Sequence, residues 1–324
     1  MRVAVIDDFL KVALKTGDWA PVQAKAEVTV FTDHLADPKA LVERLKPFEI
    51  VAVMRERSAF PRAVLEQLPN LKLLVTAGMV NRSIDVAAAT DNGILLCGTE
   101  SQGNSTGELA WGLILATARN IPASDADVRQ GGWQLGVGMG LQNKTLGILG
   151  LGKIGTRVAK VGLAFNMKVL AWSQNLTDER CKEVGVEKAA SKDDLLRRAD
   201  VVTIHLVLSE RTRGLIGAPE LALMKPHAIL VNTSRGPIIQ QDALLAALEA
   251  GRIGGAGLDV HDIEPLPADH PMRKAPRTVI TPHLGYVSDS SFGAFYGGTA
   301  EDIAAYLDGK PIRVLNPDVL QKKA

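Results

Sequence analysis

The chain has 324 residues, of which 46% are hydrophobic and 23% charged, a composition typical of a soluble globular protein. Lysine and arginine (37) almost balance aspartate and glutamate (36), so the net charge is +1. A chain without a basic surplus lacks the electrostatic signature of nucleic-acid or anionic-membrane binding, and we expect neither partner. The length favours two domains of about 100–200 residues each.

The two cysteines and the first residues of the chain bear on the cellular compartment of the protein. Cys97 and Cys181 have no CxxC spacing, which argues against a disulfide framework or a zinc cluster and fits a reducing environment. Asp7 and Asp8 fall where a signal peptide would need apolar residues, and the longest apolar run, residues 109–118, is too short to cross a bilayer. We therefore expect a cytoplasmic protein without a membrane partner.

The N-terminal part of the chain alternates short apolar runs with stretches of helical character. The apolar runs predict five buried strands, at residues 3–6, 28–31, 50–54, 73–75 and 94–96. Such alternation is typical of parallel βαβ units. No glycine fingerprint follows the first run, so we expect an α/β domain without its own dinucleotide site and assign it to substrate binding.

Residues 105–120, STGELAWGLILATARN, predict a buried helix. Ser105 suits a helix cap, Glu108 follows three residues later, and a long apolar face comes after it. The next stretch, GGWQLGVGMG, has glycine spacing that resembles a phosphate-binding loop. No strand precedes it, so we predict an ordinary loop there.

A second series of strands follows in the middle and C-terminal parts of the chain. Its members are expected at residues 145–149, 168–171, 201–205, 229–232, 255–258 and 278–280. Six parallel strands separated by helices predict a doubly wound sheet. A helix is expected at residues 298–307, and the C-terminal residues should return to the first domain.

The motif GLGKIG directly follows the strand at residues 145–149 and precedes a helix expected at 156–165. In such a fingerprint Gly150 permits a tight turn, Gly152 lets the backbone approach a pyrophosphate, and Gly155 lets the helix pack on its strand. Lys153 and Ile154 complete the motif at the start of the helix, where amide groups meet phosphate charge. The strand–turn–helix context predicts a dinucleotide site.

The choice between NAD(H) and NADP(H) stays open from the sequence. An NAD-binding protein usually has an acidic residue at the end of the second strand, where it contacts the ribose. This chain has Ser173 at that place. The missing carboxylate no longer repels a 2′-phosphate, yet Gln174, Asn175 and Leu176 supply no cation to attract one.

Arg235, Glu264 and His283 form a candidate catalytic set. Arg235 follows an apolar strand, where a planar guanidinium can bind a 2-oxo carboxylate and polarise the adjacent carbonyl. A carboxylate at Glu264 could hold one ring nitrogen of His283, so that the other nitrogen donates a proton to the developing alkoxide. An arginine in an interdomain salt bridge and a structural histidine are the alternatives.

A metal site is the competing interpretation of the region around Glu264. Several potential ligands crowd together there, namely His261, Asp262, Glu264, Asp269 and His270. Their spacing matches no standard zinc pattern and the segment is rich in proline. We therefore expect no metal.

The motifs GLGKIG, HLVLSERTRGLIG, NTSRG, GLDVHDIEP and TPHLG, in this order, resemble the D-isomer-specific 2-hydroxyacid dehydrogenases, a family that includes glyoxylate and hydroxypyruvate reductases and phosphoglycerate dehydrogenases. The resemblance runs along the whole chain. It implies an α/β protein of two Rossmann-like domains. A doubly wound nucleotide domain, residues 103–286, would be inserted into a flavodoxin-like substrate domain, residues 1–102 and 287–324, with crossings near residues 99–104 and 284–290.

The resemblance also implies roles for individual residues. Arg235 would bind substrate, Glu264 and His283 would form the acid/base pair, and Asp259 would contact the nicotinamide carboxamide. Backbone amides around Gly78, Met79 and Val80 would receive the substrate carboxylate. We expect His205 and Thr233, at strand ends, to join the cofactor site.

These patterns together predict an NAD(P)-dependent oxidoreductase that reduces a small 2-oxo acid, such as glyoxylate or hydroxypyruvate, to a D-2-hydroxy acid. The resemblance implies a homodimer formed through the nucleotide domain, with the helix at residues 105–120 contributing. The alternatives are a non-catalytic NAD(P)-sensing protein similar to a co-repressor, and a phosphite or formate dehydrogenase on the same fold. Glu264 favours a hydroxy acid dehydrogenase over a formate dehydrogenase.

Overall fold

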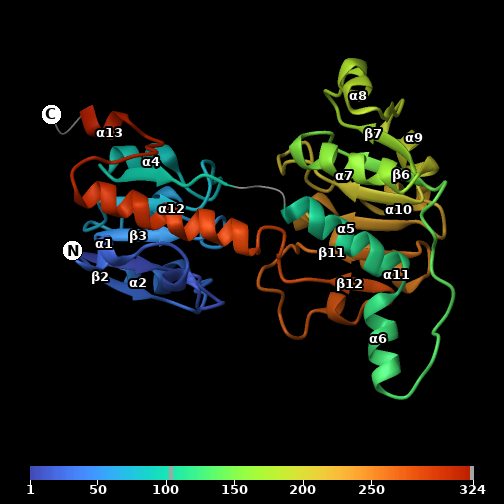
Figure 1. Cartoon of the computed structure of the whole chain (residues 1–324), viewed down its shortest axis with the longest axis horizontal. Helices are drawn as coiled ribbons and strands as arrows, with labels where there is room; N and C mark the ends of the chain where they lie inside the picture. The colour runs from blue at the N-terminus through green and yellow to red at the C-terminus, as the bar shows by residue number, and fades with distance from the viewer. Residues whose placement is uncertain (102–104, 322–324) are drawn as a thin grey trace. The chain divides into compact units, whose positions relative to one another are not determined.

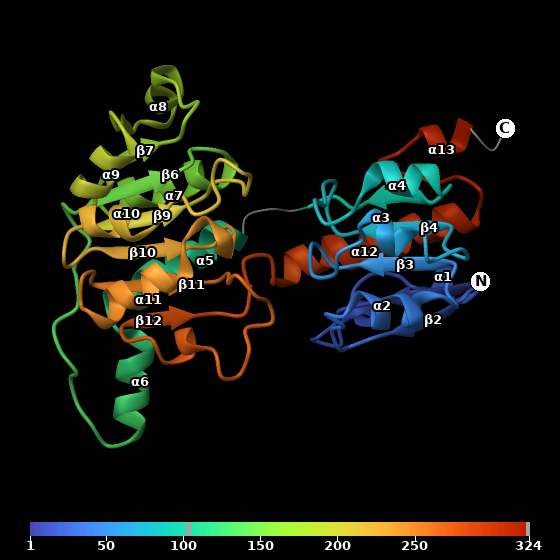
Figure 2. The ribbon, with the colours of Figure 1, turned by 180° about the vertical axis from the view of Figure 1, so that it is seen from behind.

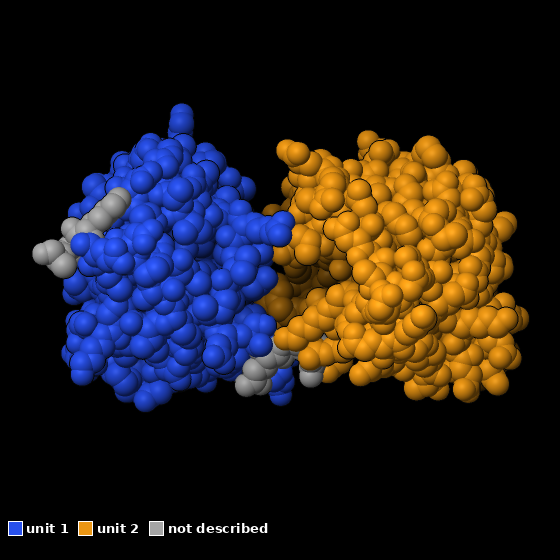
Figure 3. All heavy atoms as spheres, turned by 90° about the horizontal axis from the view of Figure 1, so that it is seen from above, with its two compact units in different colours: residues 1–103, 288–324 blue, residues 104–287 orange. Residues whose placement is uncertain are grey.

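The computed structural model describes residues 1–101 and 105–321. The chain forms two compact units, residues 1–103 with 288–324 and residues 104–287 (Figures 1 and 3). The predicted crossing at residues 99–104 includes residues 102–104, which lie outside the described residues. Each unit has its own parallel sheet, as the α/β prediction requires.

The sheet of the first unit has five parallel strands in the order β2-β1-β3-β4-β5. Their bounds are β1 (Arg2–Val5), β2 (Glu27–Val30), β3 (Ile50–Val53), β4 (Leu73–Thr76) and β5 (Leu95–Gly98). This is the flavodoxin-like order, which confirms the predicted architecture. All four residues of β3, β4 and β5 are buried, because helices cover both faces of the sheet.

Three short helices pack on one face of this sheet, α2 (Pro38–Leu45), α3 (Arg62–Leu65) and α4 (Val86–Asp91), and contribute to one apolar core with the strands. The strands β4 and β5 also contact α12 (Asp289–Leu307), which packs in turn on α1 (Ala20–Gln23). The last helix within the described residues, α13 (Asp318–Gln321), belongs to this unit. A short 3-10 helix, η1 (Ala13–Lys15), follows β1.

Helix α12 begins at Asp289, nine residues before the predicted start at 298. The first turn is rich in serine, which has low helix propensity, so no helix was predicted there. In the structure Ser288 is the N-cap, and its side chain accepts a hydrogen bond from the amide of Ser291. Phe292 and Phe295 are buried beyond this cap. Burial of this aromatic face outweighs the low helix propensity of the glycines further along.

The sheet of the second unit has seven parallel strands in the order β12-β11-β10-β9-β6-β7-β8. Their bounds are β6 (Thr145–Leu149), β7 (Lys168–Trp172), β8 (Glu187–Lys188), β9 (Val201–Ile204), β10 (Ile229–Asn232), β11 (Gly255–Leu258) and β12 (Thr278–Ile280). The order is that of a doubly wound nucleotide-binding sheet extended by β12. The expected number of six was wrong, because the exposed two-residue edge strand β8 has no apolar run.

Helices cover both faces of this sheet (Figure 2). One apolar core forms beneath α5 (Ser105–Ala118), α7 (Lys153–Ala164) and α8 (Asp178–Val184). A second core forms beneath α9 (Lys192–Arg198), α10 (Ala218–Leu223) and α11 (Gln241–Glu249). Ser105 lies within α5 instead of capping it, and its hydroxyl donates to the carbonyl of Gly285 at 2.9 Å.

Helix α6 (Ile121–Arg129) was not expected, because it has no apolar run and because Pro122 follows shortly after the helix predicted at residues 105–120. A proline in the first turn of a helix is in fact well tolerated, since its missing N–H would have no partner there. No residue of α6 is buried, and the helix projects from the second unit in Figure 1. Within the described ranges, no helix is long and apolar enough to span a membrane.

Candidate active site and cofactor site

The predicted fingerprint forms a glycine cradle between β6 and α7. Gly150 has φ +102°, and a Cβ there would lie 2.8 Å from the carbonyl oxygen of His205. A Cβ on Gly155 would lie 2.0 Å from the carbonyl oxygen of Gly150, whereas one on Gly152 would meet nothing within 4 Å. Two glycines therefore close the turn, and Gly152 leaves open space above it.

Helix α7 begins at Lys153, three residues before the predicted start, so that Lys153 and Ile154 form its first turn. The amides of this turn have no partners further back in the helix and can meet an anion. Open space at Gly152 next to such a helix start is what a pyrophosphate requires. The residues present thus fit a dinucleotide.

Two further predicted cofactor residues lie at strand ends of the same sheet. The buried Thr233 Oγ1, just after β10, has no hydrogen-bond partner among the described residues. A buried hydroxyl without a partner is uncommon and suits a site that a polar ligand completes. Burial lowers the pKa of His205 to about 4, so this histidine is neutral, and its Nε2 lies 3.0 Å from Thr203 Oγ1.

Arg235 lies on a turn between β10 and the 3-10 helix η2 (Gly236–Ile238). The side chain of Asn232 braces this turn: its Nδ2 donates to the carbonyl of Arg235 at 2.9 Å, and its Oδ1 accepts from the amide of Ser234 at 2.9 Å. The Arg235 guanidinium donates to the carbonyl of Ser234 at 2.7 Å. Asn232 was not selected from the sequence, although an asparagine two residues before a serine is a signal for such a turn.

Glu264 and His283 meet as the sequence predicts. His283 Nδ1 lies 2.6 Å from Glu264 Oε2, and Glu264 Oε1 accepts from the amide of His261 at 2.8 Å. Burial alone would raise the pKa of Glu264, but the hydrogen bond and charge of His283 outweigh it and hold this pKa below its ordinary value. Glu264 is therefore a carboxylate at neutral pH, and the bond to Nδ1 leaves Nε2 of His283 for other chemistry.

Asp259 fastens the loop that carries His283. Its Oδ1 accepts from Thr281 Oγ1 and from the amide of Leu284, both at 2.6 Å, and its Oδ2 accepts from the amide of Gly285 at 2.8 Å. The His283 amide donates to the Asp259 carbonyl at 2.9 Å. The family resemblance implies a nicotinamide contact for Asp259. Its positioning of this loop was missed because the partners lie more than twenty residues away in the sequence.

The register of the sheet explains why these residues share one edge. Asn232 pairs with Leu258, and Leu258 pairs with Ile280, in the adjacent strands β10, β11 and β12. Arg235, Glu264 and His283 follow these three strands at their carboxyl ends, where open α/β sheets bind ligands. Topology thus gathers residues that are scattered along the chain.

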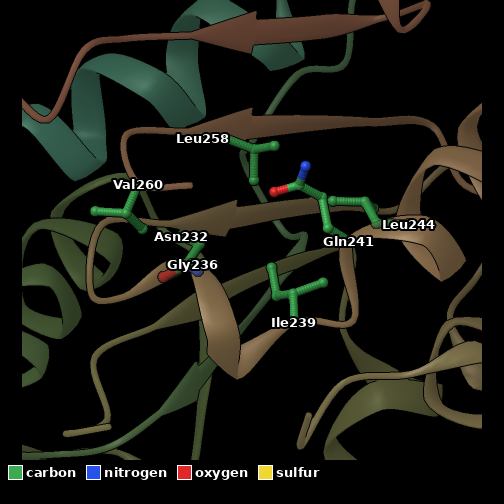
Figure 4. A pocket seen from close by; sticks show the side chains of 7 residues that line it. All are labelled: Asn232, Gly236, Ile239, Gln241, Leu244, Leu258 and Val260. Carbon is green, nitrogen blue, oxygen red and sulfur yellow. The ribbon is translucent and has the colours of Figure 1, made fainter. Parts of the chain in front are cut away.

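A small pocket lies between the turn that carries Arg235 and helix α11 (Figure 4). Gln241 lines it, and its amide group connects two parts of the segment around Glu264. Gln241 Oε1 accepts from the amide of Asp262 at 3.3 Å, and its Nε2 lies 2.9 Å from His270 Nε2. Across the residues that the structure describes, no group of three His, Cys, Asp or Glu side chains is arranged to hold a metal.

The first unit carries the loop predicted to receive a carboxylate. The amide of Gly78 already donates to Thr99 Oγ1 at 2.9 Å, so it is not free for a ligand. Met79 and Val80 are exposed, by 45% and 65%, and no hydrogen bond between described residues uses their amides. Arg55, after β3, donates to the carbonyl of Ala77 at 3.1 Å beside this loop.

The second unit combines a glycine cradle that fits a dinucleotide with an imidazole that a carboxylate holds in place. Both lie at the carboxyl ends of one parallel sheet, an arrangement typical of nicotinamide-dependent dehydrogenases. The model of the D-isomer specific 2-hydroxyacid dehydrogenase NAD binding domain matches residues 111–285. The chain belongs to the D-isomer-specific 2-hydroxyacid dehydrogenase family, as its motifs predict. Members of the family transfer a hydride between NAD(P)H and 2-oxo or 2-hydroxy acids.

The chain is similar to known proteins along most of its length, but it spans only part of some of them. A glyoxylate reductase of Aeropyrum pernix is 39% identical over 269 residues, 80% of each chain. A D-3-phosphoglycerate dehydrogenase of Methanocaldococcus jannaschii is 37% identical over 87% of this chain, which spans only 55% of that relative. A phosphoglycerate oxidoreductase of Vibrio cholerae has a solved structure that aligns with a TM-score of 0.89 at 35% identity, covering 95% of this chain and 99% of the other.

Proposed function

We propose that the protein is an NAD(P)H-dependent reductase that converts a small 2-oxo acid, glyoxylate or hydroxypyruvate, into a D-2-hydroxy acid. The contact of 2.6 Å between His283 Nδ1 and Glu264 Oε2 carries the proposal. It leaves Nε2 as the one ring nitrogen that can pass a proton to a substrate oxygen. The name of the A. pernix relative, a glyoxylate reductase, supports this choice of substrate.

When bound, the cofactor would supply or accept the hydride at its nicotinamide ring. Arg235 binds the substrate carboxylate with its guanidinium and polarises the neighbouring carbonyl. His283 donates a proton from Nε2 to the oxygen that becomes the hydroxyl, and takes it back in the oxidative direction. Glu264 stabilises the imidazolium and fixes the ring through Nδ1.

The cofactor would lie on the glycine cradle of the second unit, with its pyrophosphate at Gly152 and the first turn of α7. Ser173 would approach the adenosine ribose, and His205, Thr233 and Asp259 would line the remainder. Residues 103–286 are accordingly the proposed nucleotide domain. Residues 1–102 and 287–324 are the proposed substrate domain, in which the amides of Met79 and Val80 would bind the carboxylate.

We propose a homodimer through the second unit. The support is an apolar surface on α6 and the loop after it, consisting of Ile121 (52% exposed), Val128 (51%), Trp133 (79%), Leu135 (53%) and Val137 (102%). Exposed apolar residues at this density mark protein interfaces. Sedimentation of wild type and of Trp133→Ser tests this: a dimer that the substitution weakens supports the proposal, and a wild-type monomer contradicts it.

A cytoplasmic location is proposed on the ground that both cysteines, Cys97 and Cys181, are buried and free. Fractionation of cells that express the tagged protein would test the location. Recovery with the soluble cytoplasmic fraction is expected.

A substrate panel tests the activity. NADH and NADPH oxidation should be followed with glyoxylate, hydroxypyruvate, pyruvate and phenylpyruvate, and with formate and phosphite in the oxidative direction. Turnover of a small 2-oxo acid supports the reductase. Cofactor binding without turnover of any compound would favour a nucleotide sensor, and turnover of formate or phosphite alone would favour that chemistry.

A further inference from the structure

The end of β7 is the place where the second unit would distinguish NAD(H) from NADP(H). Ser173 stands there in place of an acidic residue, and the sequence shows no cation in the three residues that follow. The fold brings two arginines to this place from other segments. Strands β7 and β9 flank β6 in the sheet, so the loops after both border the glycine cradle.

Arg211 comes from the loop after β9. Its Nη1 donates to Gln174 Oε1 at 3.4 Å, next to Ser173. This contact is longer than a strong hydrogen bond, and it is the only one that the described residues give to the exposed Arg211 side chain. Thr212 fixes the turn, because its Oγ1 donates to the carbonyl of Val207 at 2.8 Å and accepts from the amide of Ser209 at 2.8 Å.

Arg180 comes from α8 and lies on the fingerprint itself. Its Nη2 donates to Thr156 Oγ1 at 2.8 Å, and its Nε donates to the carbonyl of Leu151, the residue between Gly150 and Gly152, at 3.5 Å. Its Nη1 pairs with Glu183 at 2.7 Å. Arg180 is therefore held in place at the cradle, whereas Arg211 can exchange its weak contact for a better one.

Acidic side chains also lie near the two arginines, and two of those on α8 are paired with cations. Asp178 pairs with Lys188 at 3.3 Å, and Glu183 is engaged by Arg180. Glu179 and Glu210 are exposed neighbours in sequence and have no ion pair within the described part of the chain. Guanidinium groups suit phosphate because they present paired donors in a plane.

We propose that Ser173, Arg180 and Arg211 form a subsite for the 2′-phosphate of the adenosine ribose, and that the protein prefers NADP(H). The proposal rests on the cofactor site assigned under the proposed function. The Ser173 hydroxyl donates to the phosphate, Arg211 moves from Gln174 to bind it, and Arg180 adds charge from the cradle side. No carboxylate at position 173 opposes this.

The test uses fragments, so it needs neither substrate nor turnover. Titration calorimetry should compare adenosine 2′,5′-bisphosphate with 5′-AMP on the full chain. Wild type should bind the bisphosphate about 10–100-fold more tightly, as expected for charge-assisted hydrogen bonds. Arg211→Ala should lose most of this difference without changing 5′-AMP binding, and Ser173→Asp should reverse the preference.

Arg197→Ala is the matched control, because Arg197 is exposed on α9 and pairs with Asp193. It should behave as wild type. Arg180→Ala should weaken binding of the bisphosphate more than of 5′-AMP; equal losses would show that Arg180 only supports the cradle and would remove it from the subsite.

Equal affinity of wild type for the two fragments would overturn the subsite while leaving the reductase proposal intact, since NADH could still serve. An advantage for the bisphosphate that survives Arg211→Ala would overturn the role of Arg211. If the fragment preference appears as expected but no 2-oxo acid turns over, the subsite stands and the proposed function fails.

Discussion

At the scale of single residues, the proposed chemistry depends on how Glu264 holds its charge. Two hydrogen bonds, from the amide of His261 and from His283 Nδ1, reach its two oxygens. They overcome the burial that would otherwise favour the neutral acid and keep the pKa of Glu264 low. The carboxylate then lies against the ring that donates a proton when an oxo acid is reduced.

Glu264→Gln should therefore slow the reaction. The neutral amide retains a hydrogen bond to the ring of His283 but places no negative charge beside the ring when it donates its proton. We expect kcat for reduction to fall about 10–100-fold. Initial rates with saturating cofactor and saturating oxo acid measure this. A kcat within a few-fold of wild type would separate Glu264 from the proton transfer.

At the scale of the elements, the site depends on close contact between two turns after adjacent strands. A Cβ on Gly236 would lie 2.1 Å from the carbonyl carbon and 2.2 Å from the carbonyl oxygen of His261. The turn that carries Arg235 thus rests directly on the segment that leads to Glu264. Backbone cannot yield as the end of a side chain can, so one of the two turns must move if Gly236 gains a side chain.

Gly236→Ala should raise KM for the oxo acid and lower kcat, by roughly 10–100-fold in kcat/KM, because small displacements of positioned groups are costly. Cofactor affinity should change little. Gly293→Ala in α12 is the control, since a Cβ there meets nothing within 4 Å and alanine favours a helix. Steady-state kinetics with a thermal melt distinguishes loss of alignment from loss of fold, and kinetics equal to wild type would contradict the argument.

At the scale of the whole molecule, Arg313 attaches the C-terminal segment to the first sheet and to a buried carboxylate of α12. Arg313 Nε donates to Asp302 Oδ1 at 2.8 Å, and the carbonyl of Arg313 accepts from the amide of Gly98 at the end of β5. Asp302 is fully buried, and its Oδ2 has no partner among the described residues. Burial raises the pKa of Asp302 to about 7, although Arg313 opposes this shift.

This raised pKa makes stability depend on pH. Between the ordinary value of 3.8 and about 7, the folded state keeps a proton that the unfolded state has lost. The unfolding free energy should therefore fall as pH rises through this window, by on the order of 1–4 kcal/mol. Asp302→Asn should remove most of this dependence of the unfolding free energy on pH. Glu301→Gln is the control and should retain it, because Glu301 is the exposed partner of Arg313. Urea unfolding at several pH values measures it; equal slopes in wild type and Asp302→Asn would refute the assignment.

Much of the fold follows from local pattern, because buried parallel strands give unbroken apolar runs and the fingerprint has a fixed local context. The strand β8 and helix α6 were missed because both are exposed and lack such runs. At the site, Arg235, Glu264 and His283 could be selected by their chemistry. The fastening by Asn232 and Asp259 and the approach of Arg211 to Gln174 depend on register between strands, which spacing along one chain does not reveal.

The central claim is that His283 transfers the proton, and His283→Ala tests it most directly. Oxidation of NAD(P)H with saturating oxo acid should fall about 10²–10⁴-fold while the cofactor Kd, measured by nicotinamide fluorescence, stays within about twofold. His227→Ala, at the exposed amino end of β10 where His227 pairs with Asp200, should keep wild-type rates. Turnover in His283→Ala within a few-fold of wild type would contradict the account.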